Sequence, residues 1–490
     1  MPPKPIVILH GWSDVSTSFR SLKTHIQKRL GRPMESIFLA DWVSLDDDVT
    51  YADLADGMER AWSEHPALKR TARSADCIVH STGGLVVREW MIRHYPDRLP
   101  PIHRLVMLAP ANFGSPLAHH GKSVVGRARN GYKKLRGGSA DRAFETGTHI
   151  LDGLELGSGY SFDLAERDLF GAAGEKFGKD GVLTTVLIGN EGNKGPLGIL
   201  EFDGSDGVVR TSCASLRCRR LTAFFEALPR DPRAPIEAEL EPCTAHTAFR
   251  VVNRLDHGDV TLNKWARKGS KDRDEQERAL DLICDSLEVT PAKFAGHVDR
   301  LDDETAELQE ALDTASEDQE GFFDLFVEPD DEKHGHHSFI LQMRDTQGQG
   351  LKDWLLEYYD TDEVNWNTGR IKASKSLTKL FNRRVIDDVH TWSRDPSHRA
   401  FHLDVTEIEN LIEDGEGRRI SISVTAEPAL STSDRGRGNR AGYYSYNDED
   451  IGALKLGLAE LPGYFPMHAS TIARFEIERC QAPEIFEIRA

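Results

Sequence analysis

The sequence lacks the features of a membrane-spanning or Sec-secreted protein. No apolar run reaches the roughly 18 residues that a transmembrane helix needs. The opening stretch, "MPPKPIVILHGW", enters an apolar strand pattern without the charged n-region, long apolar segment and cleavage site of a signal peptide. We therefore expect a cytoplasmic protein, with export by a signal-independent route as the alternative.

Cysteine is scarce. The 490 residues include six cysteines, and their wide spacing forms neither a disulfide framework nor a zinc ribbon. This usage is typical of reduced, buried thiols.

Basic charge is in deficit. The formal net charge of -19 argues against nucleic acid as a partner. Much of the excess lies in residues 294–333, which carry fifteen Asp or Glu against two Lys or Arg. Such a run predicts a solvated, acidic helix and linker over residues 291–334.

What is present, over residues 1–290, is an alternation of short apolar runs with amphipathic stretches. This alternation predicts a parallel sheet covered by helices on both faces. The expected strands are "PIVILH", "SIFLADW", "DCIVHS", "RLVMLAP", "TTVLIGN", "RLTAFFEAL" and "AFRVVN". Residues 335–490 differ, because runs at strand period alternate with polar, glycine-bearing loops. We predict a separate β-rich, sandwich-like domain there.

An insert at about residues 117–180 interrupts the alternation and is interpreted as a helical lid. It holds a basic patch in a chain that is otherwise acidic. Each basic side chain near a membrane of anionic lipids contributes about 1 kcal/mol to the free energy of membrane binding. A solvated loop is the alternative interpretation. The patch consists of Lys122, Arg127, Arg129, Lys133, Lys134 and Arg136, with Tyr132, Leu135 and Phe144 as nearby apolar contacts.

The stretch "CIVHSTGGLVVREW" places a serine where a predicted strand meets a predicted helix. A serine hydroxyl becomes a useful nucleophile when a sharp turn exposes it and a base takes its proton. Ser81 has His80 before it and Gly83 and Gly84 after it. Val79 stands where such turns usually carry glycine, and we expect the Gly-Gly pair to give compensating room.

Acyl transfer also needs N–H donors for the developing oxyanion. The backbone N–H of Thr82, at the start of the helix, is one candidate. The loop "HGW" after the first strand supplies another, because Gly11, following His10, lets the N–H of Trp12 turn toward the site.

The acid and base follow the serine in chain order. Asp203 and Asp206 are both available as the acid, and Asp206 is preferred because it opens the tight turn "DGVV". His246 and His257 are both available as the base. His257 is preferred because it follows the strand "AFRVV", whereas His246 precedes it.

Together, "ILHGW", "VHSTGG", "LAPANFGSPLA" and "SDGVV" resemble the α/β-hydrolase fold, and within it the bacterial triacylglycerol lipases and related phospholipid esterases. The resemblance covers roughly residues 5–270. It implies Ser81 as nucleophile, Asp206 as acid and His257 as base, with Trp12 and Thr82 as oxyanion donors. It implies no required cofactor, although some lipases bind calcium, for which Asp256 and Asp259 are weak candidates. The histidines of "KHGHHS" have no supporting carboxylate or cysteine pattern, and no metal is predicted there.

The leading hypothesis is therefore a serine ester hydrolase, a lipase or phospholipase, whose partner is a lipid or phospholipid substrate at a membrane surface. Two alternatives stay open. One is an exported, toxin-like phospholipase whose C-terminal domain serves delivery or protein binding. The other is an acyltransferase that uses the same three residues.

Overall fold

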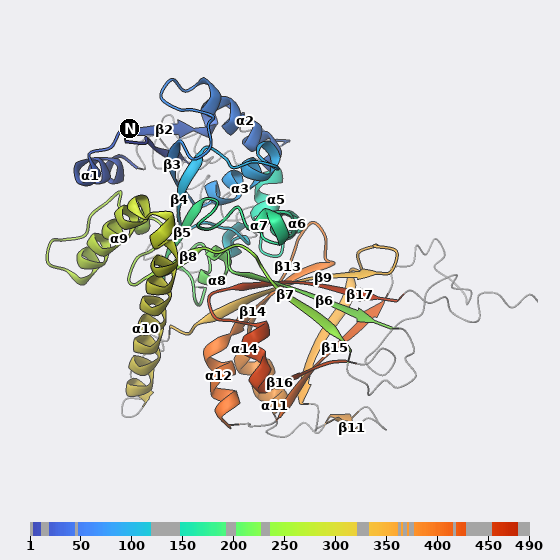
Figure 1. Ribbon diagram of the computed structural model, residues 1–490. Coiled ribbons are helices and arrows are strands. Elements are labelled where there is room, and N and C mark those ends of the chain that lie inside the picture. Colours follow the sequence, from blue (N-terminus) through green and yellow to red (C-terminus); the bar gives the residue numbers. More distant parts are fainter. Residues whose placement is uncertain are drawn as a thin grey trace, which may run out of the picture. The chain divides into compact units, whose positions relative to one another are not determined.

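A computed structural model of the chain describes residues 3–10, 19–44, 48–118, 148–192, 202–226, 236–320, 333–360, 364–365, 370–371, 377–414, 418–427 and 453–478. The chain forms two compact units (Figure 1). Unit 1 comprises residues 1–218 and 243–335, and unit 2 comprises residues 219–242 and 336–490. No helix within the described ranges is long and apolar enough to cross a membrane.

Unit 1 is built on a six-stranded parallel sheet in the order β2-β1-β3-β4-β5-β8. Every residue of the central strands β3 and β5 is buried, because helices cover both faces of the sheet. The strands are β1 (Ile6–His10), β2 (Met34–Phe38), β3 (Ala75–His80), β4 (Ile102–Leu108), β5 (Leu183–Gly189) and β8 (Ala248–Val252). This confirms the parallel α/β sheet that the sequence predicts.

The helices of unit 1 form two groups. Helices α1 and α9 contact each other and α9 contacts β4, whereas α2 and α3 pack together and α3 contacts β3 and α6 (Figure 1). Their bounds are α1 (Arg20–Leu30), α2 (Tyr51–Glu64), α3 (Gly83–His94), α5 (Thr148–Leu154), α6 (Gly159–Asp168), α7 (Gly171–Gly174), α8 (Thr211–Ala214), α9 (Lys271–Glu288) and α10 (Phe294–Glu320).

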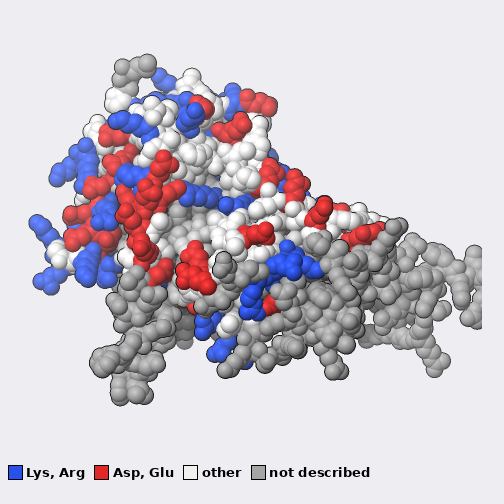
Figure 2. Space-filling view, turned by 60° about the horizontal axis from the view of Figure 1, so that its bottom comes forward, with Lys and Arg blue, Asp and Glu red and all other residues white. Residues whose placement is uncertain are grey.

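Helix α10 carries the first part of the acidic run, as far as Glu320. Phe294, Val298 and Leu301 are buried along one face of the helix, which packs against β8. Asp299 and Asp303 lie on the exposed side. Acidic side chains gather on this side of unit 1, with basic side chains beside them (Figure 2). The helix is thus amphipathic, with its charge turned to solvent.

The described part of unit 2 contains a six-stranded mixed sheet and a three-stranded sheet that share one apolar core, and a separate two-stranded sheet. The larger sheet has the order β13-β14-β9-β17-β6-β7 and the smaller one β10-β15-β16. Inward residues such as Phe339 and Leu403 of the first sheet meet Leu356 and Ile422 of the second. The predicted β-rich region is confirmed.

The elements of unit 2 have the following bounds. The strands are β6 (Cys218–Phe225), β7 (Ala238–Pro242), β9 (His336–Asp345), β10 (Asp353–Asp360), β11 (Val364–Asn365), β12 (Arg370–Ile371), β13 (Ile386–Thr391), β14 (His398–Asp404), β15 (Arg419–Glu427), β16 (Ala453–Gly457) and β17 (Ser470–Ile477). The helices are α11 (Leu377–Leu380), α12 (Val405–Asp414) and α14 (Leu461–Tyr464).

The sequence pattern does not show that residues 219–242 belong to unit 2. The chain leaves unit 1 after α8, adds β6 and β7 to the larger sheet of unit 2, and returns to form β8. The run "RLTAFFEAL" was expected among the strands of residues 1–290, and the structure pairs it with β7 in the other unit.

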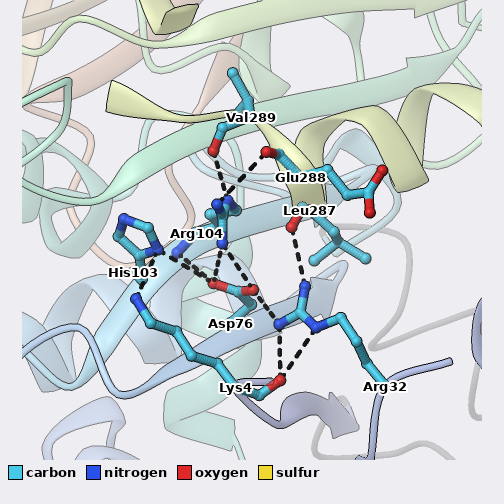
Figure 3. Close-up of polar contacts among 8 residues, drawn as sticks. All are labelled: Lys4, Arg32, Asp76, His103, Arg104, Leu287, Glu288 and Val289. Carbon is cyan, nitrogen blue, oxygen red and sulfur yellow. Dashed lines mark hydrogen bonds and ion pairs between the residues drawn. The ribbon is translucent and has the colours of Figure 1, made fainter. Parts of the chain in front are cut away.

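A buried carboxylate holds the amino-terminal edge of the parallel sheet (Figure 3). The Asp76 side chain has no solvent exposure and pairs with both Arg32 and Arg104. The two arginines also reach the end of α9, where Arg32 donates to Leu287 O at 3.0 Å and Arg104 to Val289 O at 2.6 Å. Cations are favourable at the carboxyl end of a helix, so one network joins the sheet edge to α9.

Replacing Asp76 by alanine is expected to lower the free energy of unfolding by about 3–5 kcal/mol, because two largely buried guanidinium groups would lose their counter-ion. The matched control is Asp281→Ala. Asp281 also pairs with an arginine, Arg29, but both side chains of that pair are about half exposed (57% and 42%). Its removal should cost no more than about 1 kcal/mol. Urea unfolding at constant m-value measures both, and equal small losses would contradict the assignment.

Candidate active site

Ser81 occupies a strained turn between β3 and α3. Its φ of 53° lies in the left-handed region, which is uncommon for residues other than glycine. Hydrogen bonds fix the turn on both sides. The Ser81 N–H donates to Leu108 O at 3.1 Å, and Ser81 O accepts from the N–H groups of Gly84 at 3.1 Å and Ala111 at 3.3 Å. The strain therefore exposes the serine at the carboxyl edge of the sheet, as a nucleophile requires.

The glycines after Ser81 make room for their neighbours. A Cβ atom on Gly83 would lie 3.3 Å from the Cβ of Val79, which is itself fully buried. A Cβ on Gly84 would lie 2.8 Å from the Pro110 Cβ. Because Gly83 has no side chain, it leaves space for the Val79 side chain. The turn therefore accommodates valine at a position that usually carries glycine.

Three side chains form a hydrogen-bonded line at this edge. His257 Nε2 lies 3.1 Å from Ser81 Oγ, and His257 Nδ1 lies 2.8 Å from Asp206 Oδ2. A carboxylate only accepts hydrogen bonds, so Nδ1 carries the proton and Nε2 has a free lone pair for the serine hydroxyl. The exposed fraction falls along the line, from the partly exposed Ser81 to 13% for the His257 side chain and zero for Asp206.

Asp206 is held in place by its own turn. The backbone N–H groups of Val208 and Val209 donate to Oδ1 at 3.0 and 2.7 Å. Gly207, with φ of 85°, allows the turn, and the His257 N–H donates to Asp206 O at 2.9 Å. Because Oδ1 is occupied by two backbone donors, Oδ2 is left to face the imidazole.

His80 contacts His257 through both its ring nitrogen and its ring face. Its Nε2 lies 3.1 Å from His257 O, and its ring packs 4.6 Å from the His257 ring, centroid to centroid. The Phe19 ring also contacts His80, edge-on, with the ring centroids 5.8 Å apart. His80 therefore acts on the position of the His257 loop.

The structure also separates the alternatives that the sequence left open. Asp203 is exposed, outside the line, and His246 is exposed beside Phe294. Asp256 uses Oδ1 to accept the backbone N–H groups of Gly258 and Asp259 at 2.8 and 2.7 Å. These two bonds close the turn that contains His257.

The predicted oxyanion donors are only partly described. Thr82 directly follows Ser81 and stands at the amino terminus of α3, whose backbone dipole favours negative charge. His10 ends β1, next to β3 in the sheet. Gly11 and Trp12 lie outside the described residues, as do the side chain of His10 and the basic patch of the predicted lid.

A buried ion pair behind the turn was missed by the sequence analysis. Arg88 of α3 binds Asp168 of α6 through two hydrogen bonds of 2.7 and 2.9 Å, and both side chains are fully buried. Arg88 also donates to Asn112 O at 2.9 Å, and Asn112 Nδ2 donates to Ala214 O at 2.7 Å. These bonds tie the serine helix to the loop after β4 and to the part of the insert that is described. The sequence signal was limited to Arg88 itself, which follows the apolar run Leu85–Val87 of the predicted helix.

The arrangement supplies the parts of nucleophilic acyl transfer. Ser81 offers the nucleophile, the Nε2 lone pair of His257 offers a base in contact with it, and Asp206 fixes the tautomer of that base. No group in this line requires a metal or an organic cofactor.

Comparison with known proteins gives a structural match. No protein-family model matches the chain, and no curated protein matches it in sequence. Phospholipase PlaB from Legionella pneumophila superposes with a TM-score of 0.73 at 21% identity, over 100% of this chain and 96% of that one. The same phospholipase in complex with thio-NAD gives a TM-score of 0.73 at 23% identity, over 99% and 96%.

Identities this low establish the fold alone. The match nevertheless spans both units, so it includes the β-rich unit as well as the parallel sheet. The chain has the fold of the PlaB structure over nearly its whole length, with a parallel α/β sheet in one unit and β-sheets in the other.

Proposed function

We propose that the protein is a serine hydrolase of lipid esters. The observation that carries the proposal is the hydrogen-bonded line from Ser81 through His257 to the buried Asp206, set at a strained strand-to-helix turn. A positive φ at a serine is strained, and a purely structural role would not require that strain or an imidazole nitrogen 3.1 Å from the hydroxyl. Phospholipase PlaB, which has the same fold, is named for phospholipid cleavage, and this supports a lipid ester as substrate.

The reaction begins when His257 Nε2 takes the Ser81 proton and Ser81 Oγ attacks the ester carbonyl carbon. The carbonyl oxygen becomes an oxyanion, for which the N–H groups of Thr82 and Trp12 are the proposed donors. The C–O bond to the alcohol then breaks, and His257 gives its proton to the leaving oxygen. His257 then takes a proton from water, which attacks the acyl-serine carbonyl carbon; the bond to Ser81 Oγ breaks, His257 returns the proton to Oγ, and the fatty acid leaves.

The test is hydrolysis of a short-chain p-nitrophenyl ester, a long-chain p-nitrophenyl ester and mixed phospholipid vesicles by the full-length protein. We expect turnover of all three, with the long-chain ester and the vesicles preferred. A fluorophosphonate should label Ser81 covalently and block this turnover. Absence of turnover on every ester, together with absence of labelling, would contradict the proposal. Acyl transfer to an added alcohol in place of free fatty acid would identify an acyltransferase.

A further inference from the structure

Three side chains that commonly bind metal ions converge in unit 2, separate from the serine site. They are His336, Asp387 and His402, and one ligand atom from each can be chosen so that all lie within 4.8 Å of one another. His402 Nε2 lies 4.0 Å from Asp387 Oδ2. The His336 and His402 rings stack with their centroids 4.3 Å apart. The positions are far apart in the sequence, so no linear motif reveals the group.

The register of the sheet explains how His336 and His402 meet. On the antiparallel pair of β9 and β14, Ser338 lies opposite His402, so His336 is the diagonal neighbour of His402 on the same face. The alternate residues, such as Phe339 and Phe401, face the apolar core between the two sheets of unit 2. The two histidines therefore occupy the face of the sheet that points away from that core.

The carboxylate joins them through a break in the register. On β13, Ile386 pairs with Leu403 and Asp388 pairs with His402, so Asp387 is an extra residue between them. An extra residue of this kind bends a strand and redirects side chains, and such bulges are frequent next to functional sites. The bulge brings the Asp387 carboxylate to the pair of histidines.

The three candidate ligands differ in their exposure to solvent. His336 and His402 are 2% and 1% exposed, whereas the Asp387 side chain is 31% exposed. The two rings stack with their planes 6° apart, and imidazole nitrogens are the commonest metal ligands in proteins. Because the Asp387 carboxylate is partly exposed, an ion can reach the site from solvent, and its negative charge partly neutralises the charge of the ion.

We propose that His336, Asp387 and His402 bind a divalent transition-metal ion, with zinc as the first choice. Two imidazole nitrogens and one carboxylate oxygen are typical zinc ligands, and this set disfavours calcium and magnesium, which take oxygen ligands. Tetrahedral zinc with bonds of about 2.1 Å needs ligand atoms about 3.4 Å apart, so the side chains move closer on binding and the stacked rings turn toward the ion. Water fills the fourth position.

The expected consequence concerns β13. This strand stands at one end of the strand order in the larger sheet of unit 2. The ion bridges β13 to β14 and β9, and so fastens the strand where the register break weakens its pairing. The role assigned to the metal is stabilisation of unit 2.

The test is calorimetric titration of the full-length protein with zinc after dialysis against a chelator. Wild type should bind one zinc ion per chain at this site. Asp387→Asn should weaken binding by about tenfold or more, and His402→Gln should abolish it, because each removes a ligand. The matched control is Asp353→Asn, which removes the same charge from an exposed carboxylate on β10, in the smaller sheet of unit 2, and should leave binding unchanged. Zinc should also raise the melting temperature of wild type and of Asp353→Asn, and raise that of Asp387→Asn by less at the same zinc concentration.

Several outcomes would overturn the proposal. One is that wild type does not bind zinc at all. Another is that Asp387→Asn and Asp353→Asn weaken binding equally, which would reflect net charge. Equal binding by all variants would mean adventitious zinc on other histidines. Because Asp387 is exposed, its asparagine variant is expected to fold, which circular dichroism checks. The comparison of Asp387→Asn with Asp353→Asn therefore decides the question even if His402→Gln does not fold.

Discussion

Replacement of Ser81 or His257 by alanine is expected to lower kcat for ester hydrolysis by roughly a million-fold, with little change in KM. The two side chains act as one unit, since Ser81 Oγ is a poor nucleophile until the Nε2 atom of His257, 3.1 Å away, takes its proton. Neither group is needed to bind the ground-state ester, so the loss should appear in kcat. The double variant should be no slower than either single variant, because the second change removes nothing that still works.

The chain provides a matched control for His257. His246→Ala removes the other histidine that the sequence allows as the base, and it should leave kcat unchanged, because His246 packs beside Phe294 outside the hydrogen-bonded line. Steady-state kinetics on a long-chain ester, with folding checked by circular dichroism, measures all of the variants. Loss of activity in His246→Ala with retention in His257→Ala would reverse the assignment.

Much of the candidate site was predictable because local sequence encodes it. A strand followed by His-Ser-Thr-Gly-Gly and a helix predicts the turn at Ser81, and parallel strands place their carboxyl ends at one edge. The sequence could only rank Asp203 against Asp206, and His246 against His257. Contacts between distant residues bring Asp206 and His257 together: two backbone N–H groups orient the Asp206 carboxylate, which lies 2.8 Å from His257 Nδ1.

The remaining features depend on contacts between distant parts of the chain. The run "RLTAFFEAL" has the pattern of a strand, but a period of two does not say which sheet receives it, and β6 joins unit 2. Arg88 and Asp168 are 80 positions apart, and Asp387 meets His402 only because a residue is inserted into β13. Local propensity carries no information on such pairings, whereas the packed sheet and its register determine them.

Asp206→Asn is expected to reduce kcat by about ten-thousand-fold, and the geometry predicts why this conservative change is so severe. The N–H groups of Val208 and Val209 both donate to Oδ1, so an asparagine must place its carbonyl oxygen there and its NH₂ group where Oδ2 now faces His257. His257 Nδ1 then has to accept a hydrogen bond, which forces the ring proton onto Nε2. An Nε2–H cannot take the Ser81 proton, and the base is lost although every side chain keeps its place.

Asp206→Ala separates this tautomer effect from the loss of charge. Alanine also removes the carboxylate, but it presents no donor to Nδ1, so His257 can still adopt the tautomer with a free Nε2. We therefore expect Asp206→Ala to retain more activity than Asp206→Asn, and Asp203→Asn, which changes an exposed carboxylate outside the line, to match wild type. The measurement is kcat for the three variants on one long-chain ester. If alanine proves as damaging as asparagine, the negative charge of Asp206 matters more than the tautomer that it imposes on His257.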